Sequence, residues 1–155
     1  MTDAMLLECM FGQGKLMVTP LHMAMIAGAI GCGGEVMSPQ VIAQVRSPEG
    51  RTIYEMEPIL WRHAVRPQAA EFVARVMRDV VREGTGRAAA LPGVEVAGKT
   101  GTAETGSGRD HAWFIGYAPA SRPEIALAVI VEHGGSGGSV AAPIAREMLR
   151  EYFAR

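Results

Sequence analysis

The sequence predicts an α+β fold in which helices cover an antiparallel sheet of at least three strands. Helices are predicted at about residues 19–30 and 67–83, three strand-like segments follow within residues 94–131, and a last helix begins at Pro143. Helices followed by a run of strands are typical of the α+β class. The chain has 155 residues, 48% of them hydrophobic, which suits one domain spanning residues 1–155 with a substantial core.

Two early helices are predicted from their end signals. The first runs from about Thr19 to Ile30, because Thr19 can cap it and Pro20 suits its first turn. The second starts at Pro67 and runs to about Glu83, before Gly84. In these helices and the last one, apolar residues at helical spacing predict the buried faces. These residues are Met23, Ile26, Ala27 and Ile30; Phe72, Val73, Val76, Met77 and Val80; and Ile144, Ala145, Met148, Leu149 and Tyr152.

Five extended segments are predicted. Gln40–Arg46 and Arg51–Met56 flank a Ser-Pro-Glu-Gly turn and predict a peripheral hairpin. Further strands are expected at Val94–Thr102, His111–Ala118 and Ile125–Val131. The last of these is apolar on both faces, which predicts a central strand covered on both sides. The connection before it is short enough for an antiparallel hairpin.

Charge, cysteine content and hydropathy exclude several classes of function. The 15 Lys+Arg and 16 Asp+Glu give a net charge of −1, whereas a nucleic-acid surface needs clustered excess positive charge. Cys9 and Cys32 are too few for a disulfide scaffold or a Cys-based zinc site, and no cofactor or metal is implied. The longest apolar stretch, Leu16–Ile30, is shorter than the ~18 residues of a membrane span. The start of the chain has no basic n-region, so we expect a soluble chain without a signal peptide.

A phosphate-binding loop is the first of three competing motifs. Gly93–Thr100 matches the pattern G-x-x-x-x-G-K-[ST]. Such a loop must point backbone N–H groups at phosphates and then open a helix. Here Val94 and Val96 alternate like a strand, and the residues after Thr100 have no helical periodicity. A nucleotide-binding function is therefore disfavoured.

A nucleophile elbow is the second motif. Gly134–Gly138 matches G-x-S-x-G between a predicted strand and a predicted helix. The triad of that fold needs an acid and a histidine later in the chain, but no Asp or His follows His133. The glycine run is better interpreted as a flexible turn.

The third motif is Lys99-Thr100-Gly101-Thr102 on a predicted strand. Strand alternation places the Thr100 and Thr102 hydroxyls on one face, where they can bind a carboxylate beside the positive charge of Lys99. Gly101 leaves the strand edge open to a ligand backbone, and a backbone N–H here can face a developing oxyanion.

The segments around this motif carry a resemblance to a known family. They are Phe11–Gly14, Val18–Ala24, Gly84–Ala89, Val96–Glu104 and His111–Pro119. Together, and in this order, they resemble the transpeptidase domain of class B penicillin-binding proteins. The resemblance covers nearly the whole chain and implies the penicillin-binding and β-lactamase-like transpeptidase fold.

The resemblance implies a serine acyl-transfer enzyme of cell-wall synthesis. In this family a serine attacks the D-Ala-D-Ala stem peptide, an amine accepts the acyl group, and β-lactams acylate the same serine. Lys99, Thr100 and Gly101 would be the K-T-G motif. Thr100 and Thr102 would hold the substrate carboxylate, and the Thr102 backbone N–H would form half of the oxyanion hole. Lys99 would keep the pocket positive and bind the serine of the S-x-N motif.

The family's other two motifs do not occur in this sequence. S-x-x-K requires a serine three residues before a lysine, but Gly12 and Val96 stand before Lys15 and Lys99. S-x-N is impossible because the chain has no Asn. In the family both motifs precede K-T-G, so we expect this chain to be the C-terminal part of a single transpeptidase domain. The catalytic serine and the membrane anchor of an extracytoplasmic parent would lie upstream, and the isolated chain would be inactive.

Partners and alternatives follow from the same resemblance. The complete domain would bind stem peptides and β-lactams, and this chain would bind the missing N-terminal part. In the family the strand corresponding to Ile125–Val131 pairs with N-terminal strands that are absent here, and its bare apolar edge would favour dimerisation or strand exchange. A non-catalytic carboxylate-binding or β-lactam-binding module is the alternative, and a β-lactamase or β-lactam sensor fragment also shares K-T-G. Gly12–Ala24 and Gly84–Ala89 favour the transpeptidase.

Overall fold

The structure is a computed structural model that describes residues 3–10, 12–14, 16–106 and 108–155. It contains four α-helices, seven strands and two short helical turns in this part of the chain. In order they are α1 (Asp3–Met10), α2 (Pro20–Gly31), β1 (Glu35–Met37), β2 (Gln44–Arg46), β3 (Thr52–Glu55), β4 (Leu60–His63), α3 (Pro67–Arg82), η1 (Arg87–Ala89), β5 (Ala97–Ala103), β6 (His111–Ala118), β7 (Ile125–Val131), η2 (Gly137–Ala141) and α4 (Ala142–Phe153).

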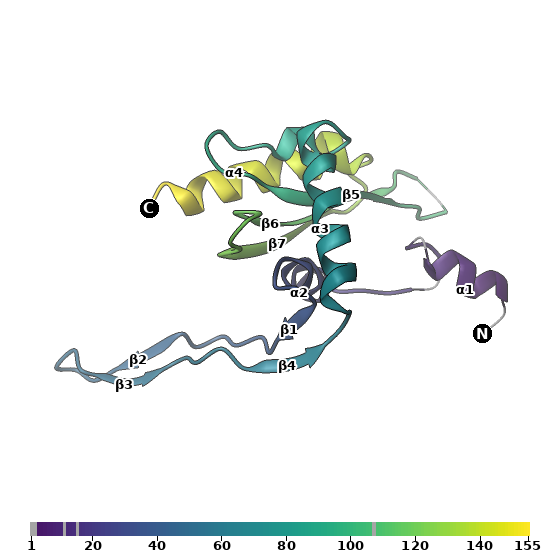
Figure 1. Cartoon of the computed structure of the whole chain (residues 1–155). Helices are drawn as coiled ribbons and strands as arrows, with labels where there is room; N and C mark the ends of the chain where they lie inside the picture. The colour runs from purple at the N-terminus through teal and green to yellow at the C-terminus, as the bar shows by residue number, and fades with distance from the viewer. Residues whose placement is uncertain (1–2, 11, 15, 107) are drawn as a thin grey trace.

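The central layer is an antiparallel sheet in the order β5-β6-β7 (Figure 1). All three strands were predicted, and the α+β class with an antiparallel sheet is confirmed. The prediction that Ile125–Val131 is a central strand is wrong for the described residues: β6 is central, and β7 lies at an edge. Its apolar composition instead reflects cover on both faces, because α2 packs on one side of β7 and α4 on the other.

Helices enclose the sheet on both faces (Figure 1). The main buried cluster joins the sheet to α4 and contains Phe114, Leu127, Val129, Ala145 and Leu149. A second cluster lies on the side of α2 and α3, where Met77, Ala97 and Tyr117 meet. Burial of large apolar side chains such as Phe114 stabilises the fold by about 1.5–3 kcal/mol each.

The predicted helices are present, but their predicted buried faces are partly wrong. In α3 the buried residues are Ala70, Met77 and Val81, whereas Phe72 is 60% exposed and Val73 and Val76 are also exposed. In the same way α4 buries Ala145 and Leu149 and leaves Ile144, Met148 and Tyr152 exposed, and α2 leaves Ile26 exposed. The described strands and helices cover only part of the apolar face of each of these helices, and the rest of each face stays exposed.

A two-stranded arm extends away from the sheet (Figure 1). The predicted hairpin is confirmed as β2 paired with β3, and a second ladder of β1 with β4 forms the base of the arm. Helix α1 and the β1–β4 ladder were not predicted, because short elements have little room for a periodic apolar pattern. None of the helices among the described residues combines the length and apolar character needed to cross a bilayer.

Candidate functional site at the edge strand β5

Strand β5 carries the predicted Lys99–Thr102 motif at one edge of the sheet. Lys99 pairs with Ile115, Thr100 with Phe114, Gly101 with Trp113 and Thr102 with Ala112 of β6. The opposite edge of β5 pairs with no other strand in the described residues. This edge therefore offers backbone N–H and C=O groups to a ligand that lies along it.

The two threonines share a face of β5 but differ in exposure. Thr100 is 8% exposed, and its Oγ1 lies 2.7 Å from Oγ1 of Thr85, in the segment that follows α3. Thr102 lies two residues further along the strand and is exposed. A hydroxyl can accept one hydrogen bond while it donates another, so the contact with Thr85 leaves Thr100 one further bond to make.

Lys99 alternates with the threonines and is exposed on the other face of β5. Its Nζ donates a hydrogen bond to the main-chain oxygen of Thr100. The ammonium group thus lies next to the backbone of the motif, where it adds a positive charge to the edge. The structure brings Lys99, Thr100, Gly101 and Thr102 together on one short strand, as the sequence predicts.

Gln13 reaches this edge from a distant part of the sequence. Its Nε2 donates to the main-chain oxygen of Thr102 over 3.1 Å. In an antiparallel strand the N–H and C=O of one residue point to the same side, so the Thr102 N–H faces the same edge as this oxygen. Gln13 and Thr85 lie in segments that carry the family resemblance, but no sequence pattern assigned either residue a role. Phe11 and Lys15, which flank Gln13, lie outside the described residues.

The structure excludes the two competing motifs. The last four residues of the phosphate-loop match, Ala97–Thr100, lie in strand β5, and no helix follows them directly. Ser136 of the elbow match lies between β7 and η2 with an ordinary extended backbone (φ −79°, ψ 129°), so it lacks the strained turn of a nucleophile elbow. Among the residues described, no group of three or more His, Cys, Asp or Glu side chains is placed to hold a metal ion.

Two histidines, His111 and His133, meet beside the site. The backbone N–H of His133 donates to Nδ1 of His111 over 3.0 Å, and Nδ1 of His133 lies 2.9 Å from the main-chain oxygen of Arg109. Their ring centroids are 4.8 Å apart. This contact joins the first residue of β6, which pairs with Ala103 at the end of β5, to the segment that follows β7.

Three groups outside β5 in the described residues have a raised pKa, and for the exposed Arg82 guanidinium the main cause is a hydrogen bond to Glu83. Burial raises the pKa of the Tyr117 phenol, an effect that Arg78 opposes and that Glu95 and Cys32 reinforce. Burial also raises the pKa of the Cys32 thiol, and the negative charge of Glu35 adds to the shift. A raised pKa leaves less thiolate at neutral pH, so Cys32 is a weak nucleophile.

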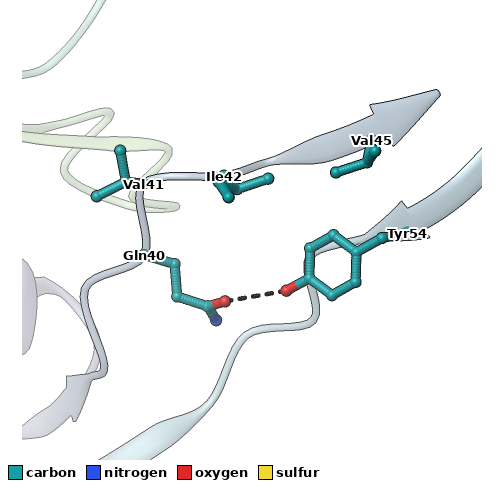
Figure 2. A pocket seen from close by; sticks show the side chains of 5 residues that line it. All are labelled: Gln40, Val41, Ile42, Val45 and Tyr54. Carbon is teal, nitrogen blue, oxygen red and sulfur yellow. Dashed lines mark hydrogen bonds between the residues drawn. The ribbon is translucent and has the colours of Figure 1, made fainter.

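A shallow hollow on the arm is separate from this strand. Figure 2 shows its five lining residues, Gln40, Val41, Ile42, Val45 and Tyr54, with the Tyr54 hydroxyl 3.2 Å from Oε1 of Gln40. The lining is mostly apolar and contains no carboxylate, imidazole, thiol or ammonium group. Apart from the Tyr54 hydroxyl, the hollow therefore lacks the groups used in acid–base or nucleophilic catalysis.

Comparison with known families identifies relatives over nearly the whole chain. Residues 7–150 match the family described as the penicillin binding protein transpeptidase domain. The peptidoglycan D,D-transpeptidase PbpA of Mycolicibacterium smegmatis is 39% identical over 144 residues, which cover 87% of this chain and 29% of that protein. The peptidoglycan D,D-transpeptidase MrdA of Haemophilus influenzae is 35% identical, with 92% of this chain and 25% of that protein covered.

Solved structures give the same result. The imipenem acyl-enzyme complex of penicillin-binding protein A from M. tuberculosis matches with a TM-score of 0.82 and 37% identity, over 92% of this chain and 32% of that one. The D,D-transpeptidase domain from Eggerthella lenta matches with a TM-score of 0.80 and 36% identity, over 88% of this chain and 32% of that one. The chain thus spans about 30% of the length of these relatives.

Proposed function

The chain belongs to the penicillin-binding protein transpeptidase family, and we propose that it is the C-terminal part of a D,D-transpeptidase domain. In this proposal β5 supplies the edge along which a D-Ala-D-Ala stem peptide or a β-lactam lies. The observation that carries the proposal is the placement of Lys99–Thr102 on an edge strand whose outer side pairs with no strand in the described residues. Family membership over residues 7–150 supports it.

Each residue of the motif has a proposed role. Thr102 and Thr100 bind the carboxylate of the ligand, and Lys99 keeps the site positive. Either hydroxyl can be the donor in the 2.7 Å contact between Thr85 and Thr100; in this proposal Thr85 donates, so the Thr100 hydroxyl keeps its own proton for the carboxylate. The Thr102 N–H stabilises the oxyanion that forms when the carbonyl is attacked. Gly101 allows the ligand backbone to approach the strand.

The nucleophile is proposed to come from residues that precede this chain in its parent. S-x-x-K and S-x-N are absent from the sequence, and a covalent acyl-enzyme needs that serine. We therefore expect the chain alone to bind β-lactams without forming a covalent bond. The parent would be anchored to the cell membrane by an upstream helix, and its catalytic half would pack against this chain.

A non-catalytic binding module is a second candidate. The sequence itself favours it in one respect, because the chain has no Asn and no S-x-x-K. A β-lactamase or β-lactam sensor fragment is a third, since these proteins share the K-T-G motif. Sequencing the DNA upstream of Met1 distinguishes the possibilities. An open frame with S-x-x-K and S-x-N supports the enzyme, and a ribosome-binding site at Met1 supports the module.

Fluorescence anisotropy with a fluorescent penicillin tests the binding proposal. Lys99→Met removes the charged partner and is expected to weaken binding by about ten-fold or more, and Thr102→Val by about two- to ten-fold. Arg51→Met and Thr52→Val are matched controls, because they remove one cation and one hydroxyl from the distant arm. These controls are expected to leave the affinity unchanged. Equal affinity for the wild type and both β5 variants would refute the proposal.

Denaturing electrophoresis of the same mixture tests whether a nucleophile is present. We expect no fluorescent protein band after boiling in detergent. A covalently labelled band would show that the chain holds its own acylated residue. It would contradict the proposal that the nucleophile comes from residues that precede this chain in its parent.

We also propose that the free edge of β7 binds another strand, either from the N-terminal part of the domain or from a second copy. β7 is an apolar edge strand, and such edges favour pairing with further chains. Light scattering should therefore show association that increases with protein concentration. Amide hydrogen exchange in Ile125–Val131 should slow over the same range, and a monomer with unchanged exchange at high concentration would contradict this part of the proposal.

A further inference from the structure

The glycine-rich turn between β7 and α4 has no role in the function proposed so far. Its sequence, Gly134–Gly138, leads into η2, and Gly137 is buried. Figure 1 shows that the chain returns here from β7 to the side of the sheet that α4 covers. The turn contacts two segments of the site, which makes it the strongest candidate for a further function.

Gly137 lies directly against the Lys99–Thr102 motif. A Cβ atom at Gly137 would overlap the main-chain oxygens of Gly101 and Trp113 and would lie 3.0 Å from the nitrogen of Gly101. These backbone atoms belong to the paired strands β5 and β6 and cannot move aside as a flexible side chain would. Glycine at this position therefore lets the turn support β5 between Thr100 and Thr102.

Gly138 lies against the second segment of the site. A Cβ atom here would be 2.6 Å from the main-chain oxygen of Thr85, and its next neighbours would be at 3.7 Å or more. Thr85 is the residue whose hydroxyl contacts Thr100 at 2.7 Å. Two consecutive glycines thus set the distance between the Thr85 segment and β5.

We propose that Gly137 and Gly138 are positioning residues that hold Thr85 and Thr100 in contact and so orient the Thr100 hydroxyl toward a ligand carboxylate. The effect on ligand binding rests on the proposed function, whereas the effect on the Thr85–Thr100 contact does not. Gly138→Ala is the decisive variant, because its added methyl group would lie 2.6 Å from the main-chain oxygen of Thr85, so the Thr85 segment must shift away from it.

A double-mutant cycle with Thr85→Val separates positioning from general destabilisation. Gly138→Ala and Thr85→Val should each weaken binding of a fluorescent penicillin by about two- to ten-fold, as expected for the loss of one neutral hydrogen bond. The double variant should bind as weakly as Thr85→Val alone, because both changes remove the same contact. Ser139 is exposed and follows Gly138 in η2. Ser139→Ala is therefore the control and should bind like the wild type.

The methyl and amide NMR signals of Thr85 and Thr100 provide a readout that needs no ligand. We expect Gly138→Ala to shift both residues, with the Thr100 signals moving toward their positions in Thr85→Val. Additive losses of affinity in the double variant, or unchanged Thr85 and Thr100 signals in a folded Gly138→Ala protein, would overturn the proposal. If the wild type binds no penicillin, the proposed function fails, and the NMR comparison alone decides whether the turn positions the threonines.

Discussion

Tyr117 shows how one buried polar atom affects the whole fold. Its side chain is fully buried, and its hydroxyl has no hydrogen-bond partner among the described residues. An unpaired buried hydroxyl costs about 1–3 kcal/mol. Burial also raises the phenol's pKa, so the protonated form is favoured in the folded state. The stability that comes from keeping the Tyr117 phenol protonated is complete below pH ~10, the ordinary pKa of tyrosine. It is lost as the pH rises through the pKa of the folded state.

Tyr117→Phe is predicted to keep or increase stability at pH 7. Removal of an unpaired hydroxyl should raise the free energy of unfolding by up to about 1 kcal/mol. It should also remove the part of the alkaline loss of stability that comes from Tyr117 ionisation. Urea denaturation at pH 7 and above pH 10 measures both effects.

Tyr152→Phe is the matched control, because Tyr152 is 37% exposed and lies in the last turn of α4. It should change stability little at either pH. A loss of more than about 1 kcal/mol in Tyr117→Phe at pH 7 would mean that the hydroxyl makes a stabilising bond, and the account of this residue would be wrong.

At the scale of elements, helix α3 shows what periodicity predicts and what it cannot. Apolar spacing and flanking residues predict its extent within one residue, but the predicted face includes Phe72, which is 60% exposed. Spacing identifies residues that share a face, whereas burial depends on which element packs there. In the structure α3 packs against β5 and α2, and its buried residues are Ala70, Met77 and Val81. No local pattern contains that long-range information.

Two substitutions in α3 test this assignment of its faces. Met77→Ala removes a side chain that is 5% exposed in the second core cluster, and it should cost about 2–5 kcal/mol of unfolding free energy. Phe72→Ser lies on the exposed side and should change stability by about 0.5 kcal/mol or less. Urea denaturation of the two variants beside the wild type measures both. The assignment is wrong if Phe72→Ser is the more destabilising.

The site was predictable only where it is local in sequence. Lys99, Thr100, Gly101 and Thr102 stand next to one another, and strand alternation gives their faces. The contacts of Thr85 and Gln13 join residues 15 and 89 positions apart and depend on the fold. The close approach of Gly137 to Gly101 is also a tertiary contact, and the glycine motif suggested a different chemistry.

At the scale of the whole molecule, the chain is a layered α+β unit with an open edge on each side of its sheet in the described residues. The order β5-β6-β7 leaves β5 free to bind a ligand and β7 free to pair with another strand. The apolar faces of α2, α3 and α4 that stay exposed agree with a unit that packs against further structure. The chain spans about 30% of the length of its relatives, and in the proposed function this surface packs against the rest of a transpeptidase domain.

An NMR titration of the isotopically labelled chain with benzylpenicillin tests the central claim most directly. The account predicts saturable shifts centred on the backbone amides of Lys99–Thr102, with smaller shifts at Thr85 and Gln13, and their loss in Lys99→Met. Shifts centred on the arm around Val41, or no shifts at saturating ligand, would contradict the assignment of β5 as the ligand-binding strand.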